Sequence, residues 1–94
     1  MIFINKIDEF LDDMANNYPE VPLNYPTGLK EAIIGSTDNI SLGTVLLLDR
    51  NKCLDILSKT MTYEEAIEYY DYNLEGSYIE GGPIYCTLID GIFN

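Results

Sequence analysis

Apolar and acidic residues alternate along the first seventeen positions with the period of a helix. The apolar positions are Phe3, Ile7, Phe10, Leu11 and Met14. They recur at the three- and four-residue spacing that places side chains on one helix face. The opposite face is acidic, with Asp8, Glu9, Asp12 and Asp13. Asn5 is suited to cap this helix, and Pro19 prevents its continuation, so residues 1–17 are predicted to form an N-terminal helix.

Three prolines separate this helix from the rest of the chain. Pro19, Pro22 and Pro26 all lie within residues 18–28, and proline at this density excludes both a helix and a central strand. The segment is therefore predicted to be an extended connector. Three alternatives stay open for it: a hinge, a segment whose apolar side chains dock on the core, or a short proline-rich ligand for a groove.

Beyond the connector, the pattern changes to short apolar runs that are typical of strands. Residues 31–35 are predicted to form a strand that ends at Gly35, and residues 36–43 are rich in turn-forming side chains. Residues 44–48 are almost entirely apolar, which favours a strand buried on both faces. The two runs are predicted to pair as a hairpin with a long loop.

Two helices are predicted next, and each begins at a capping residue. Asp49 directly follows the second strand and is suited to cap a helix over residues 50–58. Thr62 and Glu65 match the capping box of another helix. The buried stripe of that helix is predicted to contain Tyr63, Ala66, Ile67, Tyr70 and Leu74. Gly76 is suited to adopt the left-handed backbone conformation that ends this helix.

A last strand is predicted over residues 84–89, because this run is rich in β-branched and aromatic side chains. The order of elements, α-β-β-α-α-β, indicates an α+β fold in which a small three-stranded mixed or antiparallel sheet packs against about three helices. A chain of 94 residues is expected to form one domain. Its parts are the N-terminal helix (1–17), the proline-rich connector (18–28) and an α+β core (29–94).

The chain is strongly acidic. Sixteen Asp and Glu against five Lys and Arg give a net charge of -11 and a pI near 4.1. Such a surface repels nucleic acid and anionic membranes and attracts basic proteins or cations; solubility alone is the other interpretation. Histidine is absent, which excludes histidine-activated nucleophiles and removes the commonest transition-metal ligand.

The cysteine count and the hydropathy indicate a cytoplasmic protein. Cys53 and Cys86 are too few for a disulfide framework, and two buried thiols in a reducing compartment are expected, with a single bridge as the alternative. Their apolar neighbours raise a thiol pKa, which disfavours a catalytic cysteine. No apolar run reaches the ~18 residues of a membrane span, and the first residues lack the features of a signal peptide.

A candidate working surface follows the helix that begins after Thr62. Acidic residues recur there every three or four positions, away from the predicted core, and no Lys or Arg follows Lys59. The predicted partner-binding residues are Glu64, Glu68, Asp71, Tyr72, Glu75 and Glu80. Exposed tyrosine beside carboxylates is typical of interfaces. A solvated face, a Mg²⁺ or Ca²⁺ site between neighbouring carboxylates, and tyrosines packed under the connector are the alternatives.

Three runs of the sequence carry a family resemblance. They are Gly28-Leu-Lys-Glu-Ala-Ile-Ile-Gly, Leu48-Asp-Arg-Asn-Lys-Cys-Leu-Asp-Ile-Leu and Met61-Thr-Tyr-Glu-Glu-Ala-Ile-Glu-Tyr-Tyr-Asp-Tyr-Asn-Leu-Glu-Gly-Ser-Tyr. Residues 28–90 thereby resemble a family of small uncharacterised proteins of bacteria and their phages, with a helix ending in an aromatic-Asn motif, a turn, a proline and a final strand. The chain departs from this pattern at residues 79–82, which are more glycine-rich. The family has no agreed activity, so the resemblance implies no catalytic residues.

These features predict a non-enzymatic acidic binding protein that uses no cofactor and no metal. The expected partner is a basic, nucleic-acid-binding surface of a host protein, which spaced carboxylates occupy by imitating a phosphate backbone. The charge, the small size and the exposed tyrosines suggest an inhibitor of an anti-defence or anti-CRISPR kind, and the resemblance implies that a phage or mobile element encodes it, so that it would act in the host cytoplasm. No direct contact with nucleic acid or membrane is expected. The alternatives are a structural or oligomerising module, including a homodimer, and a carboxylate enzyme that uses a divalent metal.

Overall fold

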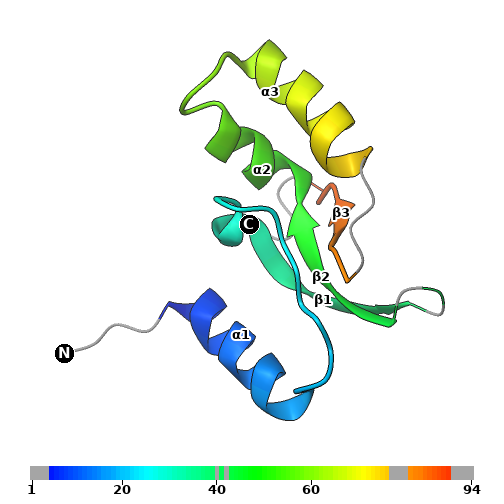
Figure 1. The fold of residues 1–94 in the computed structure, drawn as a ribbon. Coiled ribbons are helices and arrows are strands. Elements are labelled where there is room, and N and C mark those ends of the chain that lie inside the picture. The colour runs from blue at the N-terminus through cyan, green and yellow to red at the C-terminus, as the bar shows by residue number, and fades with distance from the viewer. Residues whose placement is uncertain (1–4, 40, 42, 77–80, 90–94) are drawn as a thin grey trace.

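The structure, a computed structural model, describes residues 5–39, 41, 43–76 and 81–89. Its elements follow the predicted order α-β-β-α-α-β, and its three strands form one mixed sheet, so the predicted α+β class is confirmed. Helix α1 (Lys6–Asn17) lies at one end of the molecule, and α2 (Arg50–Leu57) and α3 (Tyr63–Tyr69) lie at the other (Figure 1). The sheet lies between these two ends.

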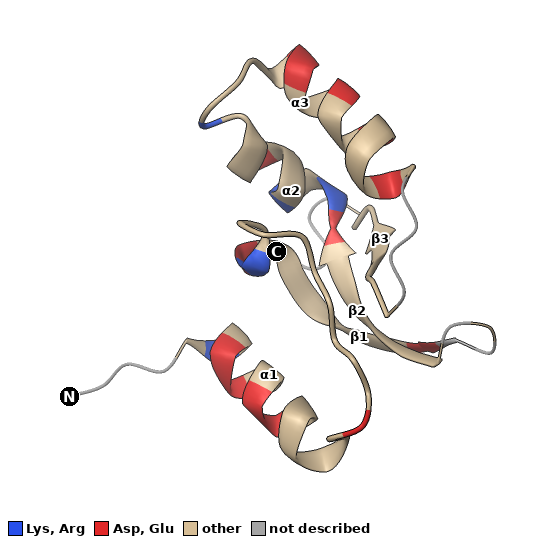
Figure 2. Ribbon diagram, in the orientation of Figure 1, with Lys and Arg blue, Asp and Glu red and all other residues tan. Residues whose placement is uncertain are grey.

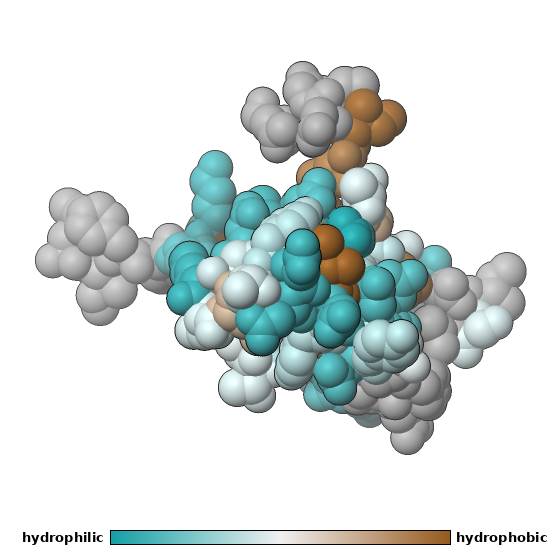
Figure 3. Space-filling view, turned by 90° about the horizontal axis from the view of Figure 1, so that it is seen from above, coloured by the Kyte–Doolittle hydropathy of each residue, from teal (hydrophilic) through white to brown (hydrophobic). Residues whose placement is uncertain are grey.

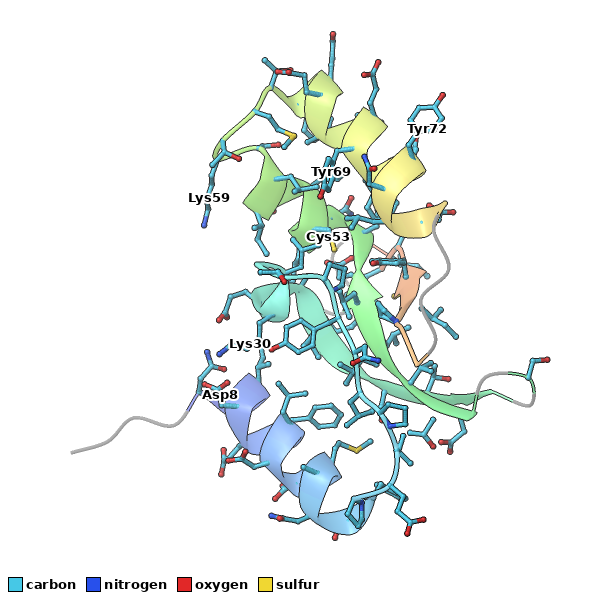
Figure 4. The ribbon with its side chains drawn as sticks, viewed as in Figure 1. Asp8, Lys30, Cys53, Lys59, Tyr69 and Tyr72 are labelled. Atoms are coloured by element: carbon cyan, nitrogen blue, oxygen red, sulfur yellow. The ribbon has the colours of Figure 1, made fainter. Side chains whose placement is uncertain are left out.

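Helix α1 is capped as predicted and is joined to the core by an ion pair. The Asn5 side chain accepts a hydrogen bond from the backbone N–H of Ile7 at 2.7 Å. Asp8 faces Lys30, with Oδ1 and Nζ 2.8 Å apart (Figure 4). The hydrogen bond and the charge of Asp8 raise the pKa of Lys30. Both side chains are partly exposed, so the pair positions α1 more than it stabilises the fold.

The proline-rich connector is a packed segment and not a free hinge. Leu23 and Tyr25 pack against the hydrophobic core, and the backbone N–H of Asn24 donates a hydrogen bond to the Gly81 carbonyl at 3.2 Å. Gly81 has a φ of +70°, and a Cβ there would lie 3.0 Å from Pro22. The connector and the approach to the last strand therefore meet at a point that only glycine fits.

The first strand differs from the prediction at both of its ends. Residues Lys30–Ala32 form a short 3₁₀ helix, η1, and the strand β1 is Ile33–Asn39. It pairs antiparallel with β2 (Gly43–Asp49) and contains a register shift between Ile33 and Gly35. The prediction that the strand stops at Gly35 is wrong, because the backbone bonds to β2 continue through residues 36–39.

A cross-strand hydrogen bond helps to explain why the turn-rich residues remain in the strand. Asp38 and Thr44 are register partners, and the Thr44 hydroxyl donates to Asp38 Oδ1 at 2.8 Å. The partner strand thus supplies hydrogen bonds that outweigh the local preference of these residues for turns. Only residues 40–42 separate the two strands, so the predicted long loop is also wrong.

Strand β2 is the centre of the sheet and is buried on both faces, as predicted. Its neighbouring side chains Val45 and Leu46 point to opposite faces of the sheet, and both are buried. On its second edge, β2 pairs in parallel with β3 (Ile84–Cys86). The prediction that the last strand reaches residue 89 is wrong. Cys86 already pairs with Asp49, where β2 gives way to α2, so the following residues have no partner on β2.

The two helices between β2 and β3 begin at the predicted caps. Asp49 caps α2 by accepting a hydrogen bond from the backbone N–H of Asn51 at 3.3 Å, and Thr62 caps α3. Both helices contribute buried side chains to the core cluster. Its members are Leu29, Ala32, Ile33, Leu46, Leu48, Cys53, Leu54, Ala66, Tyr70 and Leu74.

Helix α3 continues into a π-helical segment, η2 (Tyr70–Glu75), which the sequence did not predict. The buried stripe of the combined helix is Ala66, Tyr70 and Leu74. Tyr63, which was predicted to be buried, is 55% exposed. It occupies the first helical position, and the buried stripe begins one turn later at Ala66.

Gly76 follows η2 for a reason other than the predicted one. Its φ of -77° is right-handed, so the predicted left-handed cap is wrong. A Cβ on this residue would lie only 2.6 Å from the Asp71 carbonyl oxygen. Glycine is therefore needed because the backbone approaches itself closely after the wide π-helical turn.

Removing the capping box of α3 is expected to lower stability in a pH-dependent way. Thr62 Oγ1 accepts from the Glu65 N–H, and Glu65 Oε1 accepts from the Thr62 N–H, each at 3.1 Å. Thr62→Ala should lower the free energy of unfolding by about 1 kcal/mol. The measurement is urea unfolding at pH 7.

The titration of Glu65 gives a second test of the same capping box. The backbone and side-chain hydrogen bonds of Thr62 lower the pKa of Glu65. As the pH falls, the unfolded chain binds this proton first, below about pH 4.3, so the contribution of Glu65 is present at neutral pH and lost in acid. Glu65→Gln keeps an acceptor but cannot ionise, so its stability deficit should shrink from pH 7 to pH 3. An equal deficit at both pH values would contradict the prediction.

Candidate functional site

The predicted partner-binding residues within the described part of the chain all lie on the surface of α3 and η2. We call Glu64, Glu68, Asp71 and Glu75 the acidic strip; all four side chains are exposed. Tyr72 is 79% exposed, whereas Glu80 lies outside the described residues. Acidic residues are distributed along α3, and no Lys or Arg lies on this helix (Figure 2). Seen from this end, the described surface is mostly hydrophilic, with hydrophobic residues near the centre and at one edge of the view (Figure 3).

A surface hollow of about 380 Å³ lies beside the acidic strip. We call it the tyrosine hollow; its lining residues are Met61, Glu65, Glu68, Tyr69, Tyr72 and Asn73. The sequence prediction contained Glu68 and Tyr72 but missed Glu65 and Tyr69. The spacing of residues 65, 68, 69 and 72 is that of one helix face, and this signal could have identified them.

The tyrosine hollow forms because the opposite side of the helix is fixed by the core. Ala66, Tyr70 and Leu74 are buried and Ile67 packs against the core cluster, so residues 65, 68, 69 and 72 lie on the exposed side of the helix. The face that carries Tyr69 and Tyr72 is therefore held in place by folding itself. Glu68 lies at the border, where it belongs both to the acidic strip and to the tyrosine hollow.

Among the described residues, no Lys or Arg forms an ion pair with the carboxylates of the tyrosine hollow. Hydrogen bonds from Thr62 fix the Glu65 carboxylate and lower its pKa. Among the described residues, the single ion pair within 4 Å is that of Lys30 with Asp8, far from the hollow in sequence. Glu65 and Glu68 therefore present negative charge that no described Lys or Arg neutralises.

The two tyrosines of the hollow are exposed. Tyr69 is 42% exposed, and the Tyr72 ring points away from the body of the molecule (Figure 4). Tyr72 is thus not packed under the connector, which was the alternative for these rings. Rigid, exposed rings beside carboxylates offer a large contact area at a low cost in conformational entropy.

The acidic face of α1 is a second candidate surface at the other end of the molecule. Glu9, Asp12 and Asp13 are exposed, while Asp8 is paired with Lys30. The neighbouring hollow, of about 340 Å³, lies between α1 and the connector and is lined mainly by apolar side chains, including Leu11, Val21 and Leu23. Tyr18 and Tyr25 also line this second hollow, but no carboxylate does, which distinguishes it from the tyrosine hollow.

Arg50, Tyr70 and Tyr85 pack against one another near the ends of β2 and β3. The Arg50 guanidinium lies 5.3 Å from the centre of the Tyr70 ring, which also meets Tyr85 edge-on at 5.3 Å. Burial raises the pKa of Tyr85 to about 12 and that of Cys53 to about 11, the latter with a further contribution from the Asp49 charge. Cys53 and Cys86 are free thiols. A thiol with so high a pKa is a weak nucleophile at neutral pH.

The part of the chain that the structure describes contains neither a metal-binding cluster nor a membrane-spanning helix. Within the described residues, no group of three or more Cys, Asp and Glu side chains is placed to hold a metal ion. No described helix is long and apolar enough to cross a membrane. Comparison of the chain with protein families, with curated proteins and with solved structures finds no match.

Proposed function

We propose that this chain is a non-enzymatic acidic binding protein that occupies a basic surface of another protein, such as the nucleic-acid-binding surface of a host protein. The observation that carries the proposal is the exposed face of α3 and η2, where the acidic strip borders the tyrosine hollow. No described cation pairs with these carboxylates. A partner that supplies the missing positive charge therefore gains ion pairs without breaking any that the chain already has.

The overall charge supports the same function. A net charge of -11 on 94 residues produces a long-range field, which speeds the encounter with a basic protein and weakens as salt screens it. Carboxylates repeated along a helix present regularly spaced negative charges, as a phosphate backbone does. The more specific proposal, an inhibitor carried by a phage or a mobile element, draws on the resemblance of residues 28–90.

Binding to basic nucleic-acid-binding proteins is expected to weaken at least about fivefold between 50 and 500 mM NaCl, because salt screens the charges. The measurement is titration calorimetry of the full chain against a panel of such proteins at several salt concentrations. A duplex oligonucleotide should compete for the same surface of the partner. Affinity that does not change with salt, or no binding to any member of the panel, would contradict the proposed function.

The central position of β2 in the sheet gives less support to the alternative function, an oligomerising module, than to the binding protein. That alternative relied on the apolar run 44–48 and the final strand pairing with a second copy of the chain. Both edges of β2 are already occupied, by β1 on one side and by β3 on the other. A second copy would have to use the outer edge of β1 or of the three-residue strand β3.

A further inference from the structure

We propose that the tyrosine hollow is a receptor for an arginine side chain of the partner protein. This inference rests on the proposed function and adds the chemical group that is recognised. It places the centre of recognition at Glu65, Glu68, Tyr69 and Tyr72, and not along the whole acidic strip.

The first argument comes from the aromatic rings. Tyr69 and Tyr72 line the hollow and are both exposed, so a partner's cation can reach their faces. Tyrosine rings attract cations through the negative charge of the ring face, and arginine is the cation found there most often. The chain itself contains this pairing, with the Arg50 guanidinium 5.3 Å from the centre of the Tyr70 ring.

The second argument comes from the carboxylates and distinguishes arginine from lysine. Glu65 is held by the Thr62 N–H through Oε1, so one glutamate of the hollow is fixed in place and ionised. Glu68 lies one helical turn further on and has no described cation partner. A planar guanidinium can stack on a ring and donate from its edge to two carboxylates at once, whereas an ammonium acts as a point charge.

The third argument comes from the size and the lining of the hollow. The hollow is an open surface depression of about 380 Å³, so it suits a side chain presented from the surface of a partner better than an enclosed small molecule. Met61 is among its lining residues and adds an adaptable apolar surface for the aliphatic part of such a side chain. The shape and the lining thus fit one long side chain of a protein segment.

Hexa-arginine and hexa-lysine peptides provide the test, with the full chain and fluorescence anisotropy at 150 mM NaCl. Hexa-arginine is expected to bind about fivefold more tightly than hexa-lysine, because both peptides carry the same charge but only arginine stacks and donates in parallel. Tyr72→Leu and Glu68→Gln should each weaken hexa-arginine binding about fivefold. Circular dichroism of both variants should remain that of the wild type, since both side chains are exposed.

Two matched variants serve as controls. Tyr63→Leu removes another exposed tyrosine of α3, and Glu9→Gln removes an exposed carboxylate of α1 at the other end of the molecule; neither residue lines the hollow. Each is expected to change hexa-arginine affinity less than about twofold. Equal binding of the two peptides, or equal losses in Glu9→Gln and Glu68→Gln, would overturn the receptor while leaving salt-dependent binding of basic proteins intact. Absence of that protein binding would instead overturn the proposed function and the receptor together.

Discussion

Replacing Tyr70 with alanine is expected to lower the free energy of unfolding by about 3–5 kcal/mol. Tyr70 is only 1% exposed and is the largest fully buried side chain among the described residues. Domains of this size are stable by about 5–15 kcal/mol in total, so this substitution should remove a large part of the stability of the fold.

The expected loss has two physical sources. Removing the ring leaves a cavity in the core that the surrounding side chains fill only in part. It also removes the edge-on contact with Tyr85, where the ring planes meet at 81°, and the cation–π contact with Arg50. These contacts join the end of α3 to the start of α2 and to β3, so their loss weakens the packing of three elements at once.

Urea unfolding followed by circular dichroism measures the effect, and Tyr63→Ala is the matched control. The two tyrosines lie on the same helix, but Tyr63 is exposed, so its replacement should cost less than about 0.5 kcal/mol. Tyr70→Phe keeps the ring and should lose far less than Tyr70→Ala. Similar losses for Tyr63→Ala and Tyr70→Ala would mean that the buried face of α3 is not the one described.

Reversing the charge of Glu68 and Asp71 is expected to leave the fold intact and to weaken binding of a basic partner about 30-fold, or about 2 kcal/mol. Both side chains are exposed on the acidic strip, so Glu68→Lys and Asp71→Lys disturb no buried contact. Each lysine replaces an attraction by a repulsion at the contact surface. The measurement is titration calorimetry against the basic protein that shows the strongest salt dependence.

The double variant Asp12→Lys and Asp13→Lys is the matched control. It changes the net charge of the chain by the same amount, but on the exposed face of α1 at the other end of the molecule (Figure 2). A contact at α3 predicts that this control loses only the part of the affinity that depends on net charge. Unchanged binding after the change at Glu68 and Asp71, together with a loss in the control, would move the binding surface to α1.

Much of the fold could be predicted because its signals are local. The caps at Asn5, Asp49 and Thr62 each depend on a side chain that bonds to a backbone N–H two or three residues away. The end of α1 follows from a nearby proline, and the buried central strand follows from a continuous apolar run. In each case, the physical cause lies within a few residues, so the pattern of the sequence contains it.

The candidate surface was predicted only in part, for a similar reason. The acidic strip follows from helical spacing alone, and its described members are all exposed as expected. The tyrosine hollow depends in addition on which rings the core buries. The pattern placed both Tyr63 and Tyr70 inward, but only Tyr70 meets Tyr85 and Arg50. Glu65 was missed because its role in the capping box already accounted for it. Tyr69 was considered, like Tyr72, as either an interface ring or a ring packed under the connector, and it was not placed among the predicted partner-binding residues.

The sequence by itself determined the order of the elements, their caps and the acidic character of the outer helix face, because these follow from local bonding and periodicity. Only the tertiary structure decided where the strands begin and end. Strand β1 extends through turn-forming residues because β2 supplies hydrogen bonds, and β3 stops at Cys86 because β2 ends at Asp49. The tertiary structure likewise decided the wide turn of η2, the close approach at Gly76 and the hollow beside Tyr72. These features depend on contacts between segments that are distant in sequence or on backbone geometry that no single residue type specifies.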